Sequence, residues 1–294
     1  MTNKRELGFI SARRARSAIA LIGLGLVSAV AVQLWPVQSA YASVARFGTP
    51  TTATTTGATS VSIAKPTGAT SSHVLIATVT INGTGTATTD QICPPAGWTS
   101  VARTTNTGIV QEVFRNTGGD AGPFVFSFKA TSCATGGAIT RRASSGIVAY
   151  SGVDTAAPIA AATSPGTTGT SGTMGTGSFT TATGNFLVAA FGIASNTNVS
   201  PIGATEAFDV SGGAGAAPNG PTTQVEDTVL SCNVSASATC AASLNASFSA
   251  GGAAPWVAHL IALKRGGNVA PTANAGSSSP NEDAVNHPIT LSGS

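Results

Sequence analysis

The sequence FVFSFK at residues 124–129 places three phenylalanines at every second position. Side chains of a β-strand point alternately to its two faces, so this spacing predicts a strand with one face in an apolar core. The sequence LNASF at residues 244–248 alternates in the same way. No segment shows a sustained 3.6-residue period of apolar residues, the sign of an amphipathic helix. The chain is therefore predicted to be all-β and antiparallel.

Two further runs, NFLVAAFGI at 185–193 and WVAHLIALK at 256–264, are apolar almost throughout. We expect central strands there, because a strand covered on both faces needs no polar side. The chain is 42% hydrophobic and only 9% charged, so it can bury a sizeable core and lacks the composition of a disordered protein. The expected fold is an antiparallel β-sandwich, jelly-roll-like, with about 12 strands in two duplicated halves.

The duplication is read from the order of these runs. HVLIATVTI at 73–81 begins one series and NFLVAAFGI begins the other, so Val74 would correspond to Phe186, and later Ile147 to Val257. Each series also holds a Pro-x-Gly turn, at residues 95–97 and at residues 201–203.

The domain boundaries follow from this duplication. We expect a duplicated domain over residues 61–265, with halves at about 61–153 and 177–265, after a Thr-rich lead-in at 43–60. The sequence leaves open whether the halves form one large sandwich with a pseudo-two-fold axis or two small tandem ones.

Residues 1–42 have the three parts of a secretory signal peptide. A basic start precedes the apolar run from Ala18 to Val32, and Ala40 and Ala42 stand where signal peptidase reads small residues, so Ser43 would begin the mature chain. The alternative is an uncleaved anchor, but the run of 15 residues is short of the roughly 20 that span a bilayer. We expect a signal helix, secretion to the extracellular space or cell surface, and no membrane span after cleavage.

Charge argues against a nucleic-acid partner. Five of the 14 basic residues lie in the predicted leader, so the mature chain would keep nine basic and ten acidic residues, a net charge of −1. A protein that neutralises phosphates needs a basic face.

Four cysteines, all after the leader, predict disulfides in an exported chain. Three pairings are open; we favour Cys93 with Cys133 and Cys232 with Cys240, because each bond then stays within one half. No CxxC spacing occurs and the three histidines are scattered, so no metal site is expected from these residues.

Candidate catalytic and binding residues are few. There is no G-x-S-x-G motif for a hydrolase. Glu112 and Glu226 fall on corresponding strands and could be weighed as a glycosidase pair, but we expect both on the solvent face, Glu112 beside Arg115. Trp98 and Trp256 are the candidates for stacking on a sugar, with a role as core anchors as the alternative. We predict no catalytic residue.

The phrases PPAGWTSVAR (94–103), IVAYSGVDTAAPI (147–159) and PWVAHLIALK (255–264) resemble a repeat-built β domain of large secreted bacterial proteins. That resemblance implies a jelly-roll or lectin-like sandwich without a defined catalysis. Residues 266–294 resemble a linker and the start of an immunoglobulin-like module of the PKD or cadherin-like kind, with the chain a fragment or ending early. In that class acidic residues bind calcium near module junctions, which here points only to Glu282 and Asp283. Otherwise no cofactor is expected.

Together these observations predict a non-catalytic extracellular module of a multidomain protein, with a structural or adhesive role. Its partner would be an extracellular polysaccharide or a surface protein. Two alternatives stay open: a lectin-like carbohydrate-binding domain, and an accessory domain of a secreted glycoside hydrolase.

Overall fold

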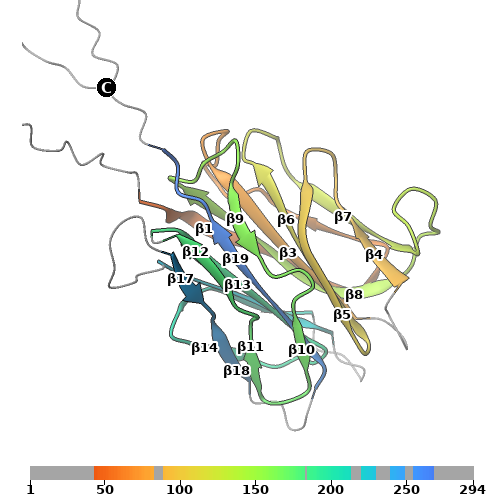
Figure 1. Cartoon of the computed structure of the whole chain (residues 1–294). Helices are drawn as coiled ribbons and strands as arrows, with labels where there is room; N and C mark the ends of the chain where they lie inside the picture. The colour runs from red at the N-terminus through yellow and green to blue at the C-terminus, as the bar shows by residue number, and fades with distance from the viewer. Residues whose placement is uncertain are drawn as a thin grey trace, which may run out of the picture. The chain divides into compact units, whose positions relative to one another are not determined.

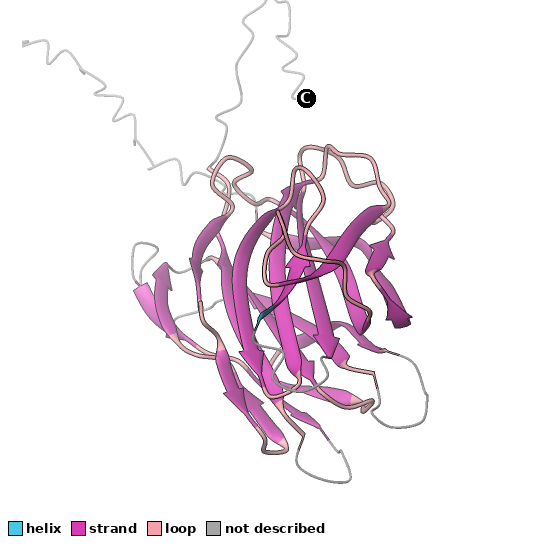
Figure 2. Ribbon diagram, turned by 90° about the vertical axis from the view of Figure 1, so that its right-hand side faces the viewer, coloured by secondary structure: helices cyan, strands magenta, loops and turns pink. Residues whose placement is uncertain are grey.

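A computed structural model describes residues 43–82, 89–182, 184–212, 220–229, 239–248 and 254–267. These segments hold nineteen β-strands and no α-helix, so the predicted all-β antiparallel fold is confirmed, with more strands than the 12 expected (Figures 1 and 2). The predicted signal peptide and all but the first two residues of the tail at 266–294 lie outside the described residues.

The first half is a sandwich of two antiparallel sheets. The larger sheet has the order β1-β8-β3-β6-β5, with strands β1 (Ala45–Ala58), β8 (Arg141–Ser151), β3 (Val74–Asn82), β6 (Ile109–Thr117) and β5 (Thr99–Asn106). The smaller sheet has the order β2-β7-β4, with β2 (Ser60–Ile63), β7 (Phe124–Ala130) and β4 (Asp90–Cys93). The pairs β1–β8, β2–β7 and β3–β6 are nested, as in a jelly roll.

The second half repeats the arrangement of these eight strands and adds three more. Its larger sheet has the order β10-β19-β13-β16-β15, with β10 (Thr167–Gly169), β19 (Trp256–Leu263), β13 (Phe186–Ile193), β16 (Thr222–Val229) and β15 (Thr205–Ser211), and with β9 (Ile159–Ala162) also on β19. The covering strands are β11 (Thr173–Gly175), β18 (Asn245–Phe248) and β14 (Val199–Ile202), and β12 (Phe179–Ala182) pairs β17 (Thr239–Ala242). The nested pairs recur as β10–β19, β11–β18, β12–β17 and β13–β16.

Local details support the duplication. Gly97 and Gly203, which end the two Pro-x-Gly turns, both have φ of +84°, a conformation that glycine adopts readily. The strand after each turn then shifts register against its neighbour, between Ser100 and Ala102 and between Glu206 and Phe208. A β-bulge at the same place in both halves shows that the copies share their irregularities as well as their strand order.

One expected correspondence is wrong. Ala77 pairs with Ile147, whereas its counterpart Ala189 pairs with Leu260, so Ile147 corresponds to Leu260 and not to Val257. Ile147 and Leu260 each face the core of their own sandwich.

The two sandwiches pack against each other through their larger sheets. Each sandwich has its own core between its sheets, and a third cluster lies where the larger sheets meet. This third cluster joins residues of both halves, among them Val74, Ile76, Val113, Val148, Phe186, Val188, Phe208, Val225, Ile261 and Leu263. The open alternatives are thereby resolved: two tandem sandwiches share a buried face, which makes four layers of sheet.

Two segments expected outside the halves belong to them. The Thr-rich lead-in at 43–60 supplies β1, a strand of 14 residues that pairs with β8 at the edge of the first large sheet. The segment between the halves, residues 154–176, supplies β9, β10 and β11. Strand β1 therefore begins at Ala45, two residues after Ser43, the predicted first residue of the mature chain, and the lead-in is a paired strand rather than a loose segment.

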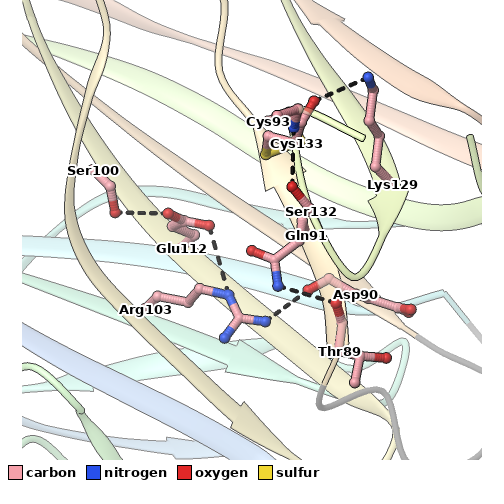
Figure 3. The surroundings of a disulfide bond; sticks show 11 residues. Thr89, Asp90, Gln91, Cys93, Ser100, Arg103, Glu112, Lys129, Ser132 and Cys133 are labelled. Atoms are coloured by element: carbon pink, nitrogen blue, oxygen red, sulfur yellow. Dashed lines mark hydrogen bonds and ion pairs between the residues drawn. A yellow bond between two sulfur atoms is a disulfide. The ribbon is translucent and has the colours of Figure 1, made fainter. Parts of the chain in front are cut away.

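The predicted bond between Cys93 and Cys133 is present, and Figure 3 shows its surroundings. It ties the end of β4 to the loop after β7, across 40 residues of sequence. Lys129 Nζ donates a hydrogen bond of 3.0 Å to the backbone oxygen of Cys133. Cys232 and the side chain of Cys240 lie outside the described part of the chain, so the second predicted bond stays a prediction.

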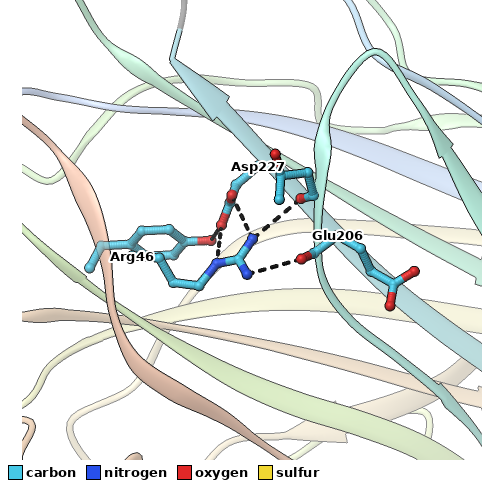
Figure 4. A network of polar contacts seen from close by, with 5 residues as sticks. Arg46, Glu206 and Asp227 are labelled. Carbon is cyan, nitrogen blue, oxygen red and sulfur yellow. Dashed lines mark hydrogen bonds and ion pairs between the residues drawn. The ribbon is translucent and has the colours of Figure 1, made fainter.

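Polar contacts cross the face between the sandwiches at two places. On one side Arg46 of β1 bonds both carboxylate oxygens of Asp227 on β16, at 2.9 and 2.7 Å, and the hydroxyl of Tyr150 donates to the same carboxylate at 3.1 Å (Figure 4). Further along, the hydroxyls of Ser144 and Thr223 lie 2.6 Å apart, and Thr223 donates to Thr80 at 2.7 Å. Buried polar groups that find partners only in one arrangement help to fix how the sheets are aligned.

The chain enters and leaves this body at one place. Ser43 packs against Gly152, and the backbone nitrogen of Gly266 donates to the oxygen of Gly152 at 2.8 Å. Ser43 and Gly266, near the two ends of the described chain, therefore lie against the same residue.

We predict that Asp227→Ala lowers the free energy of unfolding by about 3 kcal/mol, because it leaves the Arg46 guanidinium and the Tyr150 hydroxyl without their shared partner in a buried face. Urea or guanidinium unfolding measures the change. The matched control is Asp154→Ala, which breaks the exposed pair with Lys264 and two local backbone hydrogen bonds and is expected to lower the unfolding free energy by clearly less than Asp227→Ala does. Equal effects of the two substitutions would contradict the role assigned to Asp227.

We also predict that the double substitution Cys93→Ala and Cys133→Ala costs roughly 4 kcal/mol of unfolding free energy, because the unfolded chain regains the freedom of a 40-residue loop. Denaturant titration of the oxidised, reduced and substituted chains measures the loss. The reduced chain should be no more stable than the double variant, which would keep any bond between Cys232 and Cys240; a variant as stable as the oxidised chain would contradict the prediction.

Candidate functional site

The carboxylate of Glu112 lies inside the first sandwich, not on its solvent face. Ser100 Oγ donates to Glu112 Oε1 at 2.6 Å, and Arg103 Nε lies 3.8 Å from Glu112 Oε2 (Figure 3). Burial raises the pKa of Glu112 to about 7, while the Ser100 hydrogen bond and the Arg103 charge oppose that rise. The expected placement of Glu112 beside Arg115 is wrong, because the alternation of β6 turns Glu112 toward the core side that Val110 and Phe114 share.

Four side chains at the corresponding place of the second sandwich form what we call the acidic edge: Glu206, Asp209, Gln224 and Glu226. They share one face of two paired strands, with Glu206 directly opposite Glu226 and Asp209 directly opposite Gln224. Gln224 Nε2 donates to Glu206 Oε2 at 3.2 Å and to the Val199 oxygen at 3.0 Å. The backbone nitrogen of Val199 donates to Asp209 Oδ2 at 2.9 Å.

Glu226 is the most unusual member of the acidic edge. It is 0% exposed, and neither of its carboxylate oxygens has a hydrogen-bond partner among the described residues. Burial raises the pKa of Glu226 to about 8, with a further contribution from the charge of Glu206. Like charges directly opposite on paired strands are destabilising, so this pair costs the fold free energy.

Asp209 is half-buried in the same environment. Burial raises its pKa to about 6, the charge of Glu206 adds to the rise, and the Val199 N–H opposes it. Its Oδ1 and the Oε1 of Gln224 are also buried without a partner among the described residues. Four oxygen atoms of the acidic edge thus lack hydrogen-bond donors.

The first sandwich shows which residues occupy the equivalent positions in the other half of the duplication. The register of the strands places Arg103 where the second half has Asp209, Glu112 where it has Gln224, and Phe114 where it has Glu226. A half-buried cation faces a buried carboxylate in the first half, whereas the second half places carboxylates without a cation on the same backbone frame.

Glu112 and Glu226 do not face each other across a cleft. Glu112 points toward the first core and Glu226 toward the second, and the two larger sheets with their shared cluster stand between these cores. The arrangement therefore does not supply the facing carboxylates of a glycosidase.

His73 and His259 are both packed against neighbouring residues of the fold. His73 Nδ1 accepts a hydrogen bond of 3.1 Å from the Thr70 nitrogen, and its ring packs on Phe47. His259 is fully buried between the sandwiches, with Nδ1 3.3 Å from the Thr163 oxygen. Burial lowers the pKa of His259 to about 4, so it is neutral near pH 7.

Both candidate sugar-stacking tryptophans are buried. Trp98 is 7% exposed and packs edge-on against Phe124 and Phe126, and Trp256 is 6% exposed against Gly169. Neither indole offers an open ring face to a sugar, so stacking as a binding role for Trp98 and Trp256 lacks support from their positions. They lie where the alternative, core anchors, would put them.

Sequence reasoning missed the acidic edge. It expected Glu226 on the solvent face and did not connect it with Glu206 or Asp209, because the spacing of Glu206 and Asp209 hides the bulge that brings both onto the face of Gln224 and Glu226. The signal that could have found them is the duplication itself, aligned through the two Pro-x-Gly turns.

Within the ranges described, no group of three or more His, Cys, Asp or Glu side chains is already arranged to hold a metal ion. The same ranges contain no helix long and apolar enough to cross a membrane. Glu282 and Asp283, the acids of the tail, lie outside them. No protein-family model, curated protein or solved structure matches this chain.

We predict that the free energy of unfolding, measured in EDTA so that no divalent cation is bound, falls as pH rises from about 5 to about 8. In that window the folded chain keeps the proton on Glu226 that an ordinary carboxyl with a pKa of 4.5 has lost in the unfolded chain. Glu226→Gln should remove up to about 4 kcal/mol of this dependence, because it keeps the shape of the side chain without its charge.

Denaturant unfolding at several pH values measures the slope. Asp154→Asn is the control, because its contacts with Lys264 and with the backbone of Ala157 and Ala156 lower the pKa of this carboxyl, so the pH dependence that it adds lies at acidic pH. If Glu226→Gln and the unmodified chain show parallel curves between about pH 5 and pH 8, the burial of an ionisable carboxyl at this position is refuted.

Proposed function

We propose that this protein is a non-catalytic extracellular module with a structural or adhesive role on a secreted or cell-surface protein. The observation that carries the proposal is the adjacency of its ends: Ser43 and Gly266 both lie against Gly152. A domain whose ends meet projects sideways from the chain that carries it and presents the opposite end to its surroundings.

The packing of the two halves supports a rigid module. A shared apolar face, the contacts of Asp227 with Arg46 and Tyr150, and the hydroxyl contacts around Thr223 hold the sandwiches in one relative position. Rigid coupling lets a partner bind both halves at once without ordering them first.

The disulfide supports an extracellular location. Cys93 and Cys133 close a loop in the first sandwich, and such bonds persist in oxidising compartments. With the leader at residues 1–42, this favours export of the folded domain.

The test is a fractionation and attachment experiment with the full chain. We expect the protein in the medium or on the cell surface, without residues 1–42, with Cys93 and Cys133 oxidised, and we expect beads coated with it to attach to extracellular polysaccharide or to cells. Beads coated with the chain unfolded by reduction and denaturant are the control. Recovery from the cytoplasm with free thiols, or turnover of a glycoside, ester or peptide substrate, would refute the proposal.

A further inference from the structure

We propose that the acidic edge of the second sandwich (Glu206, Asp209, Gln224 and Glu226) is a binding site for a divalent cation of the calcium type. The inference concerns residues that the proposed structural role does not use, and it stands or falls independently of that role.

The first argument is the set of orphaned atoms. Asp209 Oδ1, Gln224 Oε1 and both carboxylate oxygens of Glu226 are buried without a hydrogen-bond partner among the described residues. Buried polar atoms in folded proteins nearly always have partners, and an unsatisfied one calls for an explanation such as a bound ion. All four are oxygen acceptors, the ligand type that hard cations bind.

The second argument is the burial of Glu226. Its side chain is fully buried on the core side of β16, directly opposite Glu206 and beside Ala189 of β13. An unpaired carboxylate there costs several kcal/mol unless it is protonated or neutralised. A bound cation would neutralise it and would turn the repulsion between Glu206 and Glu226 into shared ligation.

The first sandwich is an internal comparison for charge. Arg103 Nε lies 3.8 Å from the Glu112 carboxylate there, and Phe114 fills the position of Glu226. In the second half Asp209 stands at the position of Arg103, so the frame loses its cation and gains carboxylates. Arg46 reaches the backbone oxygen of Glu206, but its guanidinium is bonded to Asp227 (Figure 4).

The ligand chemistry selects the class of cation. Carboxylates and an amide oxygen suit hard cations, and the absence of sulfur or imidazole among these four side chains disfavours zinc and copper. Ca²⁺ tolerates irregular geometry better than Mg²⁺, which requires a near-ideal octahedron.

Binding requires one local movement. The four side chains do not converge on one point in the structure. Among the described residues, no group of three or more acids, histidines or cysteines is arranged to hold a metal ion. Glu206 is exposed on the edge strand β15, and its carboxylate turns to Gln224 Nε2. We expect rotation of this exposed side chain to release the Gln224 amide and to bring a third carboxylate toward the cation.

The test is calorimetric titration of the full, EDTA-treated chain with CaCl₂. We expect one site per chain with a Kd of about 10⁻⁴ to 10⁻³ M, the range of extracellular calcium modules, and a rise in the unfolding midpoint at about 10 mM Ca²⁺. Because ligating carboxylates must be deprotonated, binding should release protons at about pH 7 and fewer at about pH 9. Titration in two buffers of different ionisation enthalpy measures that release.

Glu226→Gln and Asp209→Asn should each weaken Ca²⁺ binding by about tenfold or more while the chain stays folded in EDTA, since each keeps the shape of the side chain. Glu226→Phe installs the residue of the first half and should abolish the Ca²⁺-dependent shift of the midpoint. Glu112→Gln, at the matched place in the first sandwich, should leave Ca²⁺ binding unchanged.

Three results would overturn the proposal: no heat and no stabilisation at about 10 mM Ca²⁺, unchanged affinity in a folded Glu226→Gln chain, or equal stabilisation by Mg²⁺ at the same concentration, which would indicate screening rather than a site. Failure here leaves the attachment experiment unaffected, so the two proposals are judged separately.

Discussion

The structure depends on one constraint: two large sheets must be covered on both faces. Every residue of β13 and of β19 is buried, because one face of each packs in the second core and the other packs against the first sandwich. Sheets stack at about 10 Å only where side chains interdigitate, and here small residues make the close approaches. Gly146 lies under the ring of Phe208, and Gly192 lies against Thr80, so a side chain at either glycine would collide with the opposite sheet.

Apolar packing alone does not fix how two such faces align, since two apolar surfaces can pack in more than one relative position. The buried hydroxyls of Thr80, Ser144 and Thr223, and the carboxylate of Asp227, find their partners in a single alignment. The duplication therefore acts at two levels. It repeats one jelly-roll-like sandwich, and it pairs the copies through a face that neither could leave exposed to water.

Much of the fold could be predicted from the sequence, and the failures have physical causes. Alternation in FVFSFK and LNASF marks strands that have one solvent-exposed face, so these two strands were predicted correctly. The edge strand β1 has no such pattern: its threonines are half-exposed, and its pairing with β8 is made by backbone groups, which any residue supplies. The register of β19 was misread by three residues because a continuously apolar run carries no mark of which residue faces which core.

The acidic edge escaped prediction for a related reason. The rule that an acid on a strand faces water assumes that the strand has a solvent-exposed face. Strand β16 has none over its first six residues, because it lies between two cores and buries Thr222 to Asp227. Asp227 is buried there and bonds Arg46 and Tyr150, so its burial is compensated within the chain. Glu226, one residue away and pointing to the other core, has no such compensation. Since the first sandwich has Phe114 at the same position, the fold itself does not require a carboxylate there, and the burial of Glu226 is compensated by protonation or, as we propose, by a bound cation.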